Sequence, residues 1–447
     1  MQKNITIVGA GLVGSLTAIY LGKRGYTVNV YEKRPDLRKA NISAGKSINL
    51  VISKRGWNAL EHIGIRNRIE SITVPVYGRM THDQKGDTNY IQYSVNNDPI
   101  YSVSRGGLNS LLMTIAEENP NVKLHFNQEC SDVNLEEATA VFQHHDTKEF
   151  TTVKADHIIA TDGAFSAVRQ KMMHVNRFNY QQEYIPYGYK EITFPANPDG
   201  TPRMRQDALH IWPRKNFMLM GLANQDGGFT GTLFFPYEGE PWSFEKINNE
   251  ADLMRFFGEI FPDAIPLIPD LSHQYFNNPT SSLVIIRCAP WNYKDKVALM
   301  GDAAHAIVPF YGEGMNCGFE DCFVFDQLLE KHHGDFSKVL PEYAKTRKPN
   351  GDAIAELSLR NFIEMRDLVA DQQFLLRKKI EGWFAAKHPD KWLPLYSQVK
   401  FSNTQYADAL ASGNRHDSIM AKVMEIPGIE GKWDSTEVEQ LILSQLN

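Results

Sequence analysis

The chain has 447 residues, 42% of them hydrophobic and 22% charged, which is enough for two or three domains with sizeable cores. Its formal net charge of −6 argues against nucleic acid or an acidic membrane surface as the main partner, because both require a basic surface. The four cysteines show no CxxC pair and no spacing typical of zinc ligands, so we expect reduced thiols, no metal and a cytoplasmic protein.

The N-terminal segment carries the most specific pattern. Residues 5–8 predict a buried strand, and Gly9, Gly11 and Gly14 follow at the spacing of a dinucleotide-binding turn. The next helix, over residues 12–24, begins at Leu12 and points its positive end at the phosphates. A signal peptide or membrane helix is the alternative, but it would not place three glycines at this spacing.

A second strand, over residues 27–31, completes this pattern and ends at Glu32. Its carboxylate can accept hydrogen bonds from ribose hydroxyls and would repel a 2′-phosphate. The first cofactor is therefore FAD or NAD rather than NADP. Arg34, just beyond the strand, is included in the candidate cofactor site.

The order of elements predicts an α/β protein. Strands and helices alternate at first, which is typical of a doubly wound sheet, and period-two runs in residues 74–103 and 187–286 predict an inserted antiparallel sheet. We expect a Rossmann-like FAD-binding domain, a β-sheet substrate domain and a helical C-terminal region. Their respective boundaries are residues 1–73, 105–180 and 287–335; residues 74–104 and 181–286; and residues 336–447.

Two later segments favour a flavin. Residues 156–161 predict a strand that ends at Asp162-Gly163, and residues 297–300 predict one that ends at Gly301-Asp302. Asp302 can accept a hydrogen bond from a ribityl hydroxyl. The helix expected over residues 316–329 can face the flavin pyrimidine, where negative charge appears on reduction. The residues preceding and opening that helix join the candidate cofactor site: Gly312, Gly314, Met315 and Asn316. Taken singly, either aspartate fits a helix cap or turn equally well.

These three glycine-flanked strand ends together resemble those of the single-component FAD-dependent aromatic hydroxylases. Five further stretches resemble the members that hydroxylate kynurenine: residues 46–50, 77–80, 210–213, 308–317 and 361–365. The resemblance implies bound FAD, with L-kynurenine, NADPH and dioxygen giving 3-hydroxykynurenine, NADP and water. It also implies a C4a-hydroperoxide of the flavin in a pocket that excludes water. The flavin carries the chemistry, so no residue is expected to act as acid or base.

The residues alone leave other functions open. The alternatives are a hydroxylase of another aromatic acid, an NAD-dependent dehydrogenase, and a flavin-bearing module without turnover.

The resemblance also implies a substrate site. Arg79 pairs with the substrate carboxylate, Tyr93, Asn361 and Tyr396 are further anchors, and Glu364 supports them. The ring pocket is lined by Met218, Phe234, Phe310 and Tyr311, and Arg105 faces FAD. Without the resemblance, Arg79 would be read as a surface arginine, Arg105 as an arginine at a helix start, Tyr93 as a half-buried strand tyrosine, and the ring-pocket residues as ordinary core.

Asn361 has support from periodicity as well. It lies within an apolar helical stripe of Ile354, Leu357, Met365, Leu368 and Leu375. A buried amide needs partners, and either an interhelical hydrogen bond or a substrate contact would satisfy it.

Several features remain open. Glu313 stands where relatives commonly have glutamine, and no second fingerprint locates NADPH, so we expect it to approach across the same cleft. Arg169 is either a phosphate contact for NADPH or a helix-surface arginine. The last residues contain no apolar run long enough for a transmembrane anchor, and the protein is expected to be a monomer or a dimer.

Overall fold

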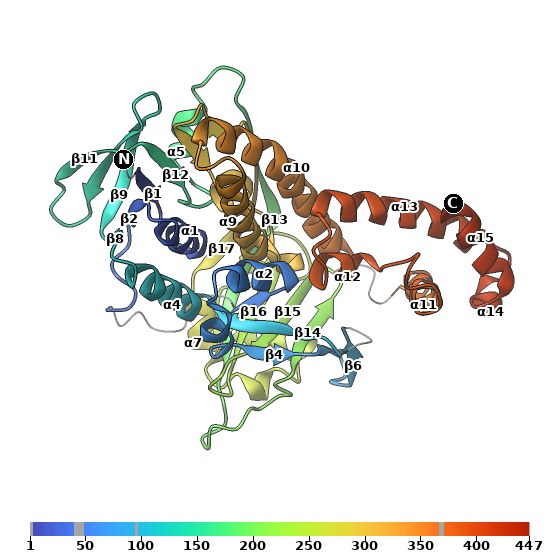
Figure 1. Ribbon diagram of the computed structural model, residues 1–447. Helices are drawn as coiled ribbons and strands as arrows, with labels where there is room; N and C mark the ends of the chain where they lie inside the picture. The colour runs from blue at the N-terminus through green and yellow to red at the C-terminus, as the bar shows by residue number, and fades with distance from the viewer. Residues whose placement is uncertain (1–2, 40–48, 94–96, 366–370, 447) are drawn as a thin grey trace.

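The computed structural model describes residues 3–39, 49–93, 97–365 and 371–446 (Figure 1). Residues 46–48 and Leu368, which the sequence interpretation used, lie outside these ranges. The α/β class is confirmed: a mostly parallel sheet with helices, a second large sheet and a helical C-terminal region make up the chain. In Figure 1 these parts follow one another from the N-terminus on the left to the C-terminal helices on the right.

The first sheet has six strands and contains the N-terminal fingerprint. Parallel pairing places Val8 beside both Ala160 and Tyr31, so three strands reach the same edge together. Only the short edge strand β18 is antiparallel. The strand order is β18 (Asn292–Tyr293), β19 (Val297–Leu299), β12 (His157–Ala160), β1 (Asn4–Val8), β2 (Thr27–Tyr31) and β8 (Val122–His125).

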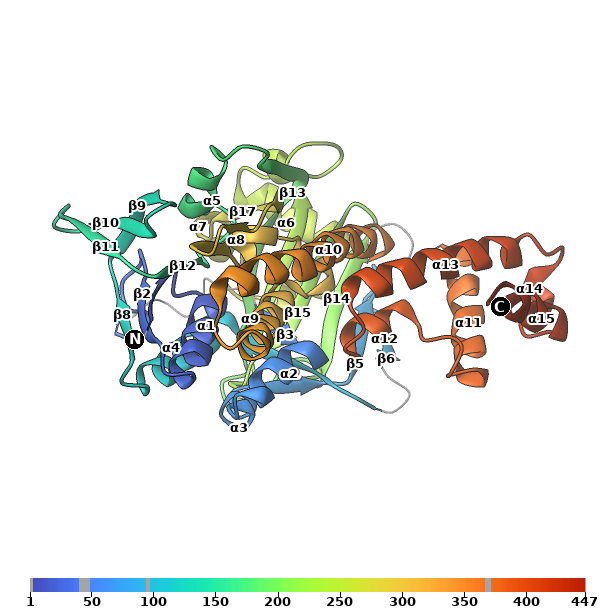
Figure 2. The same ribbon diagram turned by 45° about the horizontal axis from the view of Figure 1, so that its top comes forward.

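Helices and a small sheet cover this first sheet. Helix α1 (Leu12–Lys23) lies between α4 (Arg105–Glu117) and α9 (Gly314–Lys331), and their apolar residues join one core with the strands (Figure 2). Tyr31 of β2 stacks on Phe142 of a three-stranded meander, with ring centroids 4.0 Å apart. That meander consists of β9 (Gln128–Asn134), β10 (Thr139–His144) and β11 (Phe150–Lys154), with α5 (Ala167–Met172) beside it.

The second sheet has seven strands and differs from the prediction in one respect. Every pairing is antiparallel except that of β5 with β14, so the sheet is mixed. More than a hundred residues separate these two strands, so no hairpin fixes their relative direction. The order is β17 (Thr280–Ala289), β13 (Asn179–Phe194), β16 (Phe229–Pro236), β15 (Phe217–Ala223), β14 (Ala208–Arg214), β5 (Gly78–His82) and β6 (Thr88–Gln92).

The two faces of this sheet pack against different neighbours. Leu233 and Phe235 of β16 join a core with α6 (Glu250–Ile260) and α7 (Leu271–Asn277). Phe234, between them, points to the other face and packs with Phe310. Alternation along the strand therefore separates a purely structural face from the face that borders the cavity described below. Two short 3-10 turns also belong to this region, η1 (Phe244–Lys246) and η2 (Ile265–Leu267).

The two ends of the predicted stretch 74–103 belong to a separate small sheet. Strands β4 (Val74–Val76) and β7 (Ile100–Ser104) pair with each other, and β7 also pairs with β3 (Asn49–Ile52). Helices α2 (Lys54–His62) and α3 (Arg66–Glu70) follow β3 in the chain.

Helices make up the C-terminal region. The long α10 (Phe336–Ile363) leads to an arm with its own apolar core, which projects away from the two sheets in both views (Figures 1 and 2). The predicted stripe does not extend along one helix: α10 ends at Ile363, and Leu375 lies in the next described helix with 51% of its surface exposed. The remaining helical elements are α8 (Asp302–His305), η3 (Pro309–Tyr311), α11 (Gln372–Lys387), α12 (Leu395–Lys400), α13 (Tyr406–Met424), α14 (Ile429–Lys432) and α15 (Thr436–Leu446).

A search of the described helices for length and hydropathy finds none that would cross a membrane.

Candidate active site

A cavity of about 590 Å³ lies where the carboxyl ends of the parallel strands meet the seven-stranded sheet and the C-terminal helices. This volume is in the range of pockets for small molecules and cofactors. Most of the predicted site residues line it: Gly9, Gly11, Leu12, Glu32, Arg34, Arg79, Tyr93, Arg105, Asp162, Asp302, Phe234, Phe310, Tyr311, Gly312, Gly314, Met315, Asn361 and Tyr396. Four are not among the lining residues: Gly14, Met218, Asn316 and Glu364.

The N-terminal glycines form a cradle, and they lack side chains for two different reasons. A Cβ on Gly14 would lie 2.0 Å from the Gly9 carbonyl oxygen, and one on Gly9 would lie 2.7 Å from the Thr161 carbonyl oxygen. A Cβ on Gly11 would meet no protein atom within 4 Å, and Gly11 lines the cavity. Gly9 and Gly14 therefore serve protein packing, whereas Gly11 leaves room for a ligand. A pyrophosphate at the start of α1 fits this cradle.

Glu32 is buried at the end of β2 with both carboxylate oxygens engaged. It accepts hydrogen bonds from the Ala10 N–H at 2.9 Å and from the backbone and guanidinium of Arg34 at 3.0 and 2.7 Å. Burial alone would raise its pKa, but the hydrogen bonds from Arg34 and Ala10 hold the pKa below its ordinary value. An ionised acceptor beside the glycine turn suits ribose hydroxyls.

The two later aspartates lie at the same edge of the sheet. One oxygen of Asp162 accepts from the Ala167 N–H at 2.8 Å, and the other is buried without a partner among the described residues. Burial raises the pKa of Asp162. Asp302 is exposed at the start of α8, after Gly301 with φ of 61°. A ligand with hydroxyl donors would satisfy both side chains.

The loop before α9 is shaped by Asn316. Its amide accepts from the Ser53 N–H at 2.9 Å and donates to the carbonyls of Val51 and Gly312 at 2.8 and 3.0 Å. Asn316 thus ties the loop to β3, and its side chain is satisfied by protein. It supports the left-handed Gly312, φ 66°, which lines the cavity instead.

Arg79, in β5 of the seven-stranded sheet, also lines the cavity. Its guanidinium carbon is 5.5 Å from the ring centre of Tyr93 and 5.7 Å from that of Tyr396, and the two rings stack 5.6 Å apart. Its Nε is buried and has no hydrogen-bond partner among the described residues. Burial raises the pKa of Tyr93 to about 12, so its hydroxyl stays a neutral donor. The arrangement suits a carboxylate.

Aromatic and apolar side chains line the space next to Arg79. Phe310 packs on Phe234 and stacks on Phe362, with centroids 4.9 and 4.1 Å apart. Met218 is buried beside Phe234 in the same core, and Met220, two residues further along β15, reaches the cavity instead. Sequence reasoning also missed several apolar strand residues of this lining, Leu209, Ile211, Leu222 and Leu283, because inward strand positions look like ordinary core.

Asn361 contacts protein and borders the cavity. Its amide donates to the Phe310 carbonyl at 2.7 Å, which joins α10 to the loop before α9. This bond links α10 to the 3-10 turn η3, so an intramolecular bond between helical elements, one of the two alternatives considered from the sequence, is present. Glu364, one turn further on, lies 4.0 Å from the Lys378 ammonium and helps to raise the pKa of the buried Tyr311, after burial itself.

One buried ion pair was not predicted. Lys400 in α12 reaches into the cavity lining and donates to Glu313 at 2.7 Å. The pair joins positions 87 residues apart, and nothing in the sequence near Lys400 distinguishes it from a surface lysine. Only the unusual Glu313 gave a signal that a buried partner was needed.

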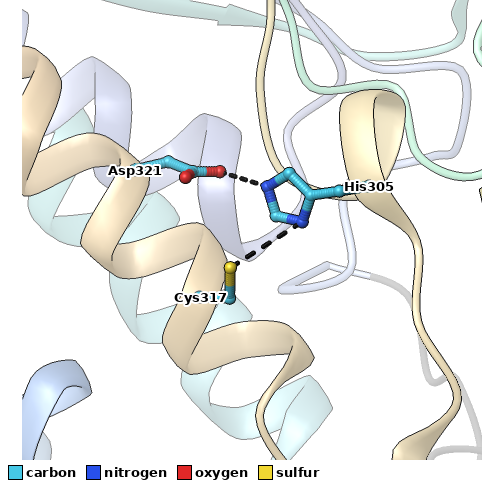
Figure 3. A group of neighbouring side chains, drawn as sticks. All are labelled: His305, Cys317 and Asp321. Carbon is cyan, nitrogen blue, oxygen red and sulfur yellow. Dashed lines mark hydrogen bonds and ion pairs between the residues drawn. The ribbon is translucent and has the colours of Figure 1, made fainter. Parts of the chain in front are cut away.

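His305, Cys317 and Asp321 bring potential metal-ligand atoms within 4.8 Å of one another (Figure 3). Spacing along the chain had not suggested this group. Arg347 donates to Asp321 at 2.7 Å and lies 3.5 Å from the Cys317 sulfur, so a cation already balances the carboxylate. Burial alone would lower the pKa of His305, but the facing Asp321 raises this pKa well above its ordinary value. The group is therefore an ion-pair cluster in which His305 pairs with Asp321.

Arg169 requires a correction. It is 1% exposed, and its guanidinium donates to the Ala303 carbonyl at 2.8 Å and to the Ala164 carbonyl. Arg169 is therefore not a helix-surface residue, and its guanidinium is not free to bind a phosphate. Instead it joins the Asp162 loop to α8.

Comparisons with known proteins agree with this architecture. A family model described as "FAD binding domain" matches residues 2–358. The kynurenine 3-monooxygenase of Flavobacterium psychrophilum is 48% identical, with all of both chains covered. That of Myxococcus xanthus is 43% identical over 100% of this chain and 96% of its own.

Solved structures give the same fold. The tetrameric form of 2-methyl-3-hydroxypyridine-5-carboxylic acid oxygenase superposes with a TM-score of 0.67 at 20% identity, over 84% of this chain and 95% of that one. The family model and the full-length sequence identity establish more than the fold. The chain belongs to the kynurenine 3-monooxygenase family of FAD-dependent monooxygenases.

Proposed function

We propose that this protein converts L-kynurenine, NADPH, a proton and dioxygen into 3-hydroxykynurenine, NADP⁺ and water. The observation that carries the proposal is Arg79, which lies beside the stacked rings of Tyr93 and Tyr396 and whose buried Nε lacks a partner among the described residues. Kynurenine has a carboxylate at its amino-acid end for this guanidinium and an aromatic ring for the apolar chamber beside it. The relatives' names point to the same substrate.

The residues divide the cavity into a cofactor part and a substrate part. Bound FAD supplies electron transfer from NADPH and the activation of oxygen. The glycine cradle with Glu32 would hold its adenosine and pyrophosphate, and Asp302 with the Gly312 loop would hold the ribityl and ring end. Arg34, Arg105, Asp162 and Met315 also line this part. These assignments follow from position and chemistry.

The substrate part must orient the ring and exclude water. Arg79, Tyr93 and Tyr396 bind the carboxylate, Asn361 borders the ring, and the stacked Phe310 and Phe234 make the chamber apolar. Excluding water matters because activated oxygen in contact with solvent is lost as hydrogen peroxide. No protein acid or base is required, since the aniline nitrogen of kynurenine activates its own ring.

The same assignment fits a domain division. We propose that residues 1–73, 105–180 and 287–335 form the FAD-binding domain, residues 74–104 and 181–286 the substrate domain, and residues 336–447 a helical cover. The free thiols of all four cysteines support a reducing, cytoplasmic location.

Aerobic incubation with kynurenine and NADPH tests the activity. We expect a product heavier by one oxygen atom that co-elutes with authentic 3-hydroxykynurenine, and NADPH oxidation that salicylate and p-hydroxybenzoate do not stimulate. Stimulation by either of these acids would favour a hydroxylase of another aromatic acid. A yellow protein whose flavin NADPH does not reduce, whatever the ligand, would reject turnover altogether.

A further inference from the structure

Lys400 is a buried cation on the cavity wall with spare hydrogen-bonding capacity. Its side chain is 3% exposed, and its ammonium donates to Glu313 at 2.7 Å and to the Gly312 carbonyl at 3.3 Å. An ammonium has three N–H groups, so these acceptors in the described part of the chain leave one for a ligand. Gly312, which Lys400 contacts, lines the same cavity.

Glu313 holds Lys400 in place and is itself held by other side chains, among them Asn316, whose amide donates to it at 3.4 Å. Tyr406 donates to its carboxylate at 2.6 Å and Ser53 at 3.2 Å, and the Arg55 guanidinium lies 4.0 Å away. Glu313 is completely buried. A buried carboxylate requires such partners, and removing one leaves a costly uncompensated charge. The position of the ammonium is therefore fixed by the protein and does not depend on a ligand.

The pair is one end of a buried chain of alternating charges. Arg55 donates to Glu320 at 2.7 Å, Glu320 accepts from Arg347 at 2.6 Å, Arg347 also donates to Asp321, and Asp321 pairs with His305. Three carboxylates thus alternate with three basic side chains, Lys400, Arg55 and Arg347, and an imidazole lies at the far end. The near end, inside the cavity, is the Lys400 ammonium, so the chain presents positive charge to the cavity.

This positive charge lies next to the start of α9. Gly314 and Met315, the first residues of this 18-residue helix, line the cavity beside Lys400, and the helix N-terminus adds partial positive charge there. We propose that Lys400 stabilises the negative charge that the isoalloxazine of bound FAD acquires on reduction. Glu313 is a positioning residue that orients the ammonium and offsets part of its charge. The inference depends on FAD binding and not on which aromatic compound is hydroxylated.

Anaerobic redox titration of the holoenzyme against a reference dye tests this role. At fixed ambient potential we expect Lys400→Met to lower the ratio of reduced to oxidised flavin about tenfold, about 30 mV for a two-electron couple. Lys400→Arg keeps the charge and should stay near the wild-type ratio. Lys190→Met is the matched control, because Lys190 is also buried but does not line the cavity.

Glu313→Gln gives the decisive sign. The carboxamide oxygen can still accept from Lys400 or Tyr406, but the negative charge is gone, so the ratio of reduced to oxidised flavin should rise. A purely structural role would move both variants in the same direction, and that result would overturn the proposal, as would an unchanged ratio in Lys400→Met. Should Lys400→Met release its flavin, the direction of Glu313→Gln alone decides. Failure to hydroxylate kynurenine would leave these potentials unaffected, so the two proposals fail separately.

Discussion

Some side chains that line the cavity have buried polar atoms without hydrogen-bond partners in the described part of the chain. The Arg79 Nε and one oxygen of Asp162 are buried without a hydrogen bond among the described residues. A buried polar atom left unpaired costs about 1–3 kcal/mol, so a ligand that pairs with it recovers that free energy. Both residues line the cavity. In the proposed assignment a substrate carboxylate would pair with Arg79, and the cofactor would pair with Asp162.

Arg79→Lys should weaken substrate binding without affecting the cofactor. Lysine keeps the charge but loses the planar fork and the contact with the two tyrosine rings, so we expect KM for kynurenine to rise at least about tenfold, on the order of 1.4 kcal/mol. Flavin content, measured by absorbance, should be unchanged. Arg205→Lys is the matched control: Arg205 stacks on Tyr90 at 4.0 Å but is 45% exposed. Equal changes in KM in both variants would exclude the carboxylate role.

His157 should make the fold sensitive to acid. Its Nδ1 bonds the Asp295 carbonyl, its Nε2 is buried without a partner among the described residues, and burial lowers its pKa from 6.5 to about 4. Between these values the unfolded chain binds a proton that the folded chain does not. As the pH is lowered through this window, the free energy of unfolding should therefore decrease, by up to about 1.4 kcal/mol per pH unit.

Denaturant titrations from pH 4 to 7 check this slope. His157→Gln should flatten it by about one proton's share. It should leave the contributions of His210, whose burial lowers its pKa to about 4, and of His125 and His416, whose burial also lowers the pKa. His145→Gln changes a histidine that is 67% exposed and should leave the slope as in the wild type. A slope that His157→Gln does not alter would show that the folded protein protonates this imidazole.

Most of the predicted site residues line the cavity, and those that do not differ for identifiable reasons. Met218 and Met220 lie on the same face of β15, and only Met220 lines the cavity, a difference that alternation along the strand does not encode. The role of Lys400 could not be predicted from the sequence, because its partner Glu313 is 87 residues away. Pairings at such separations are set by tertiary packing, whereas the glycine turn is a local pattern and could be read directly.

Among the elements, the turn between β1 and α1 shows how the fold presents a ligand site. Sequence periodicity located β1, β2 and α1 to within one residue at each end. The seven-stranded sheet was harder, because β5 joins β14 in parallel across a long separation, and alternation within a strand carries no information on its neighbour's direction.

Gly11→Ala and Gly14→Ala should separate ligand space from packing. A Cβ on Gly11 meets only the cavity, so we expect Gly11→Ala to fold with an unchanged apo melting temperature but to lose FAD affinity at least about tenfold. A Cβ on Gly14 would lie 2.0 Å from a backbone oxygen, so Gly14→Ala should lower the melting temperature as well. Gly382→Ala, in α11 with open space around it, is the control. Wild-type FAD affinity in Gly11→Ala would contradict the cradle assignment.

Across the whole molecule, the network of buried ion pairs from Lys400 to His305 joins parts that are distant in sequence. Its members come from α2, α8, α9, α10 and α12 and from the residue that caps α9, and Tyr406 adds α13. Both loops that border the proposed flavin site are attached to it: the Gly301 N–H donates to Asp321 at 3.1 Å, and the Gly312 carbonyl accepts from Lys400. The cofactor end of the cavity and the C-terminal region are therefore coupled through buried ion pairs as well as through apolar contacts.

Arg347→Met should show how much this network of buried ion pairs contributes to the free energy of unfolding. Arg347 is 2% exposed and bridges Glu320 and Asp321, so its removal leaves two carboxylates undercompensated in the interior. Breaking a buried pair in this way costs about 3–5 kcal/mol, and we expect a correspondingly lower denaturation midpoint together with weaker FAD retention. Arg68→Met removes a pair with Glu118 in which both side chains are largely exposed, and it should cost at most about 1 kcal/mol. If the two variants unfold at the same denaturant concentration, the buried ion-pair network contributes no more to stability than an exposed surface ion pair does. The flavin-facing loops must then be held by apolar packing alone.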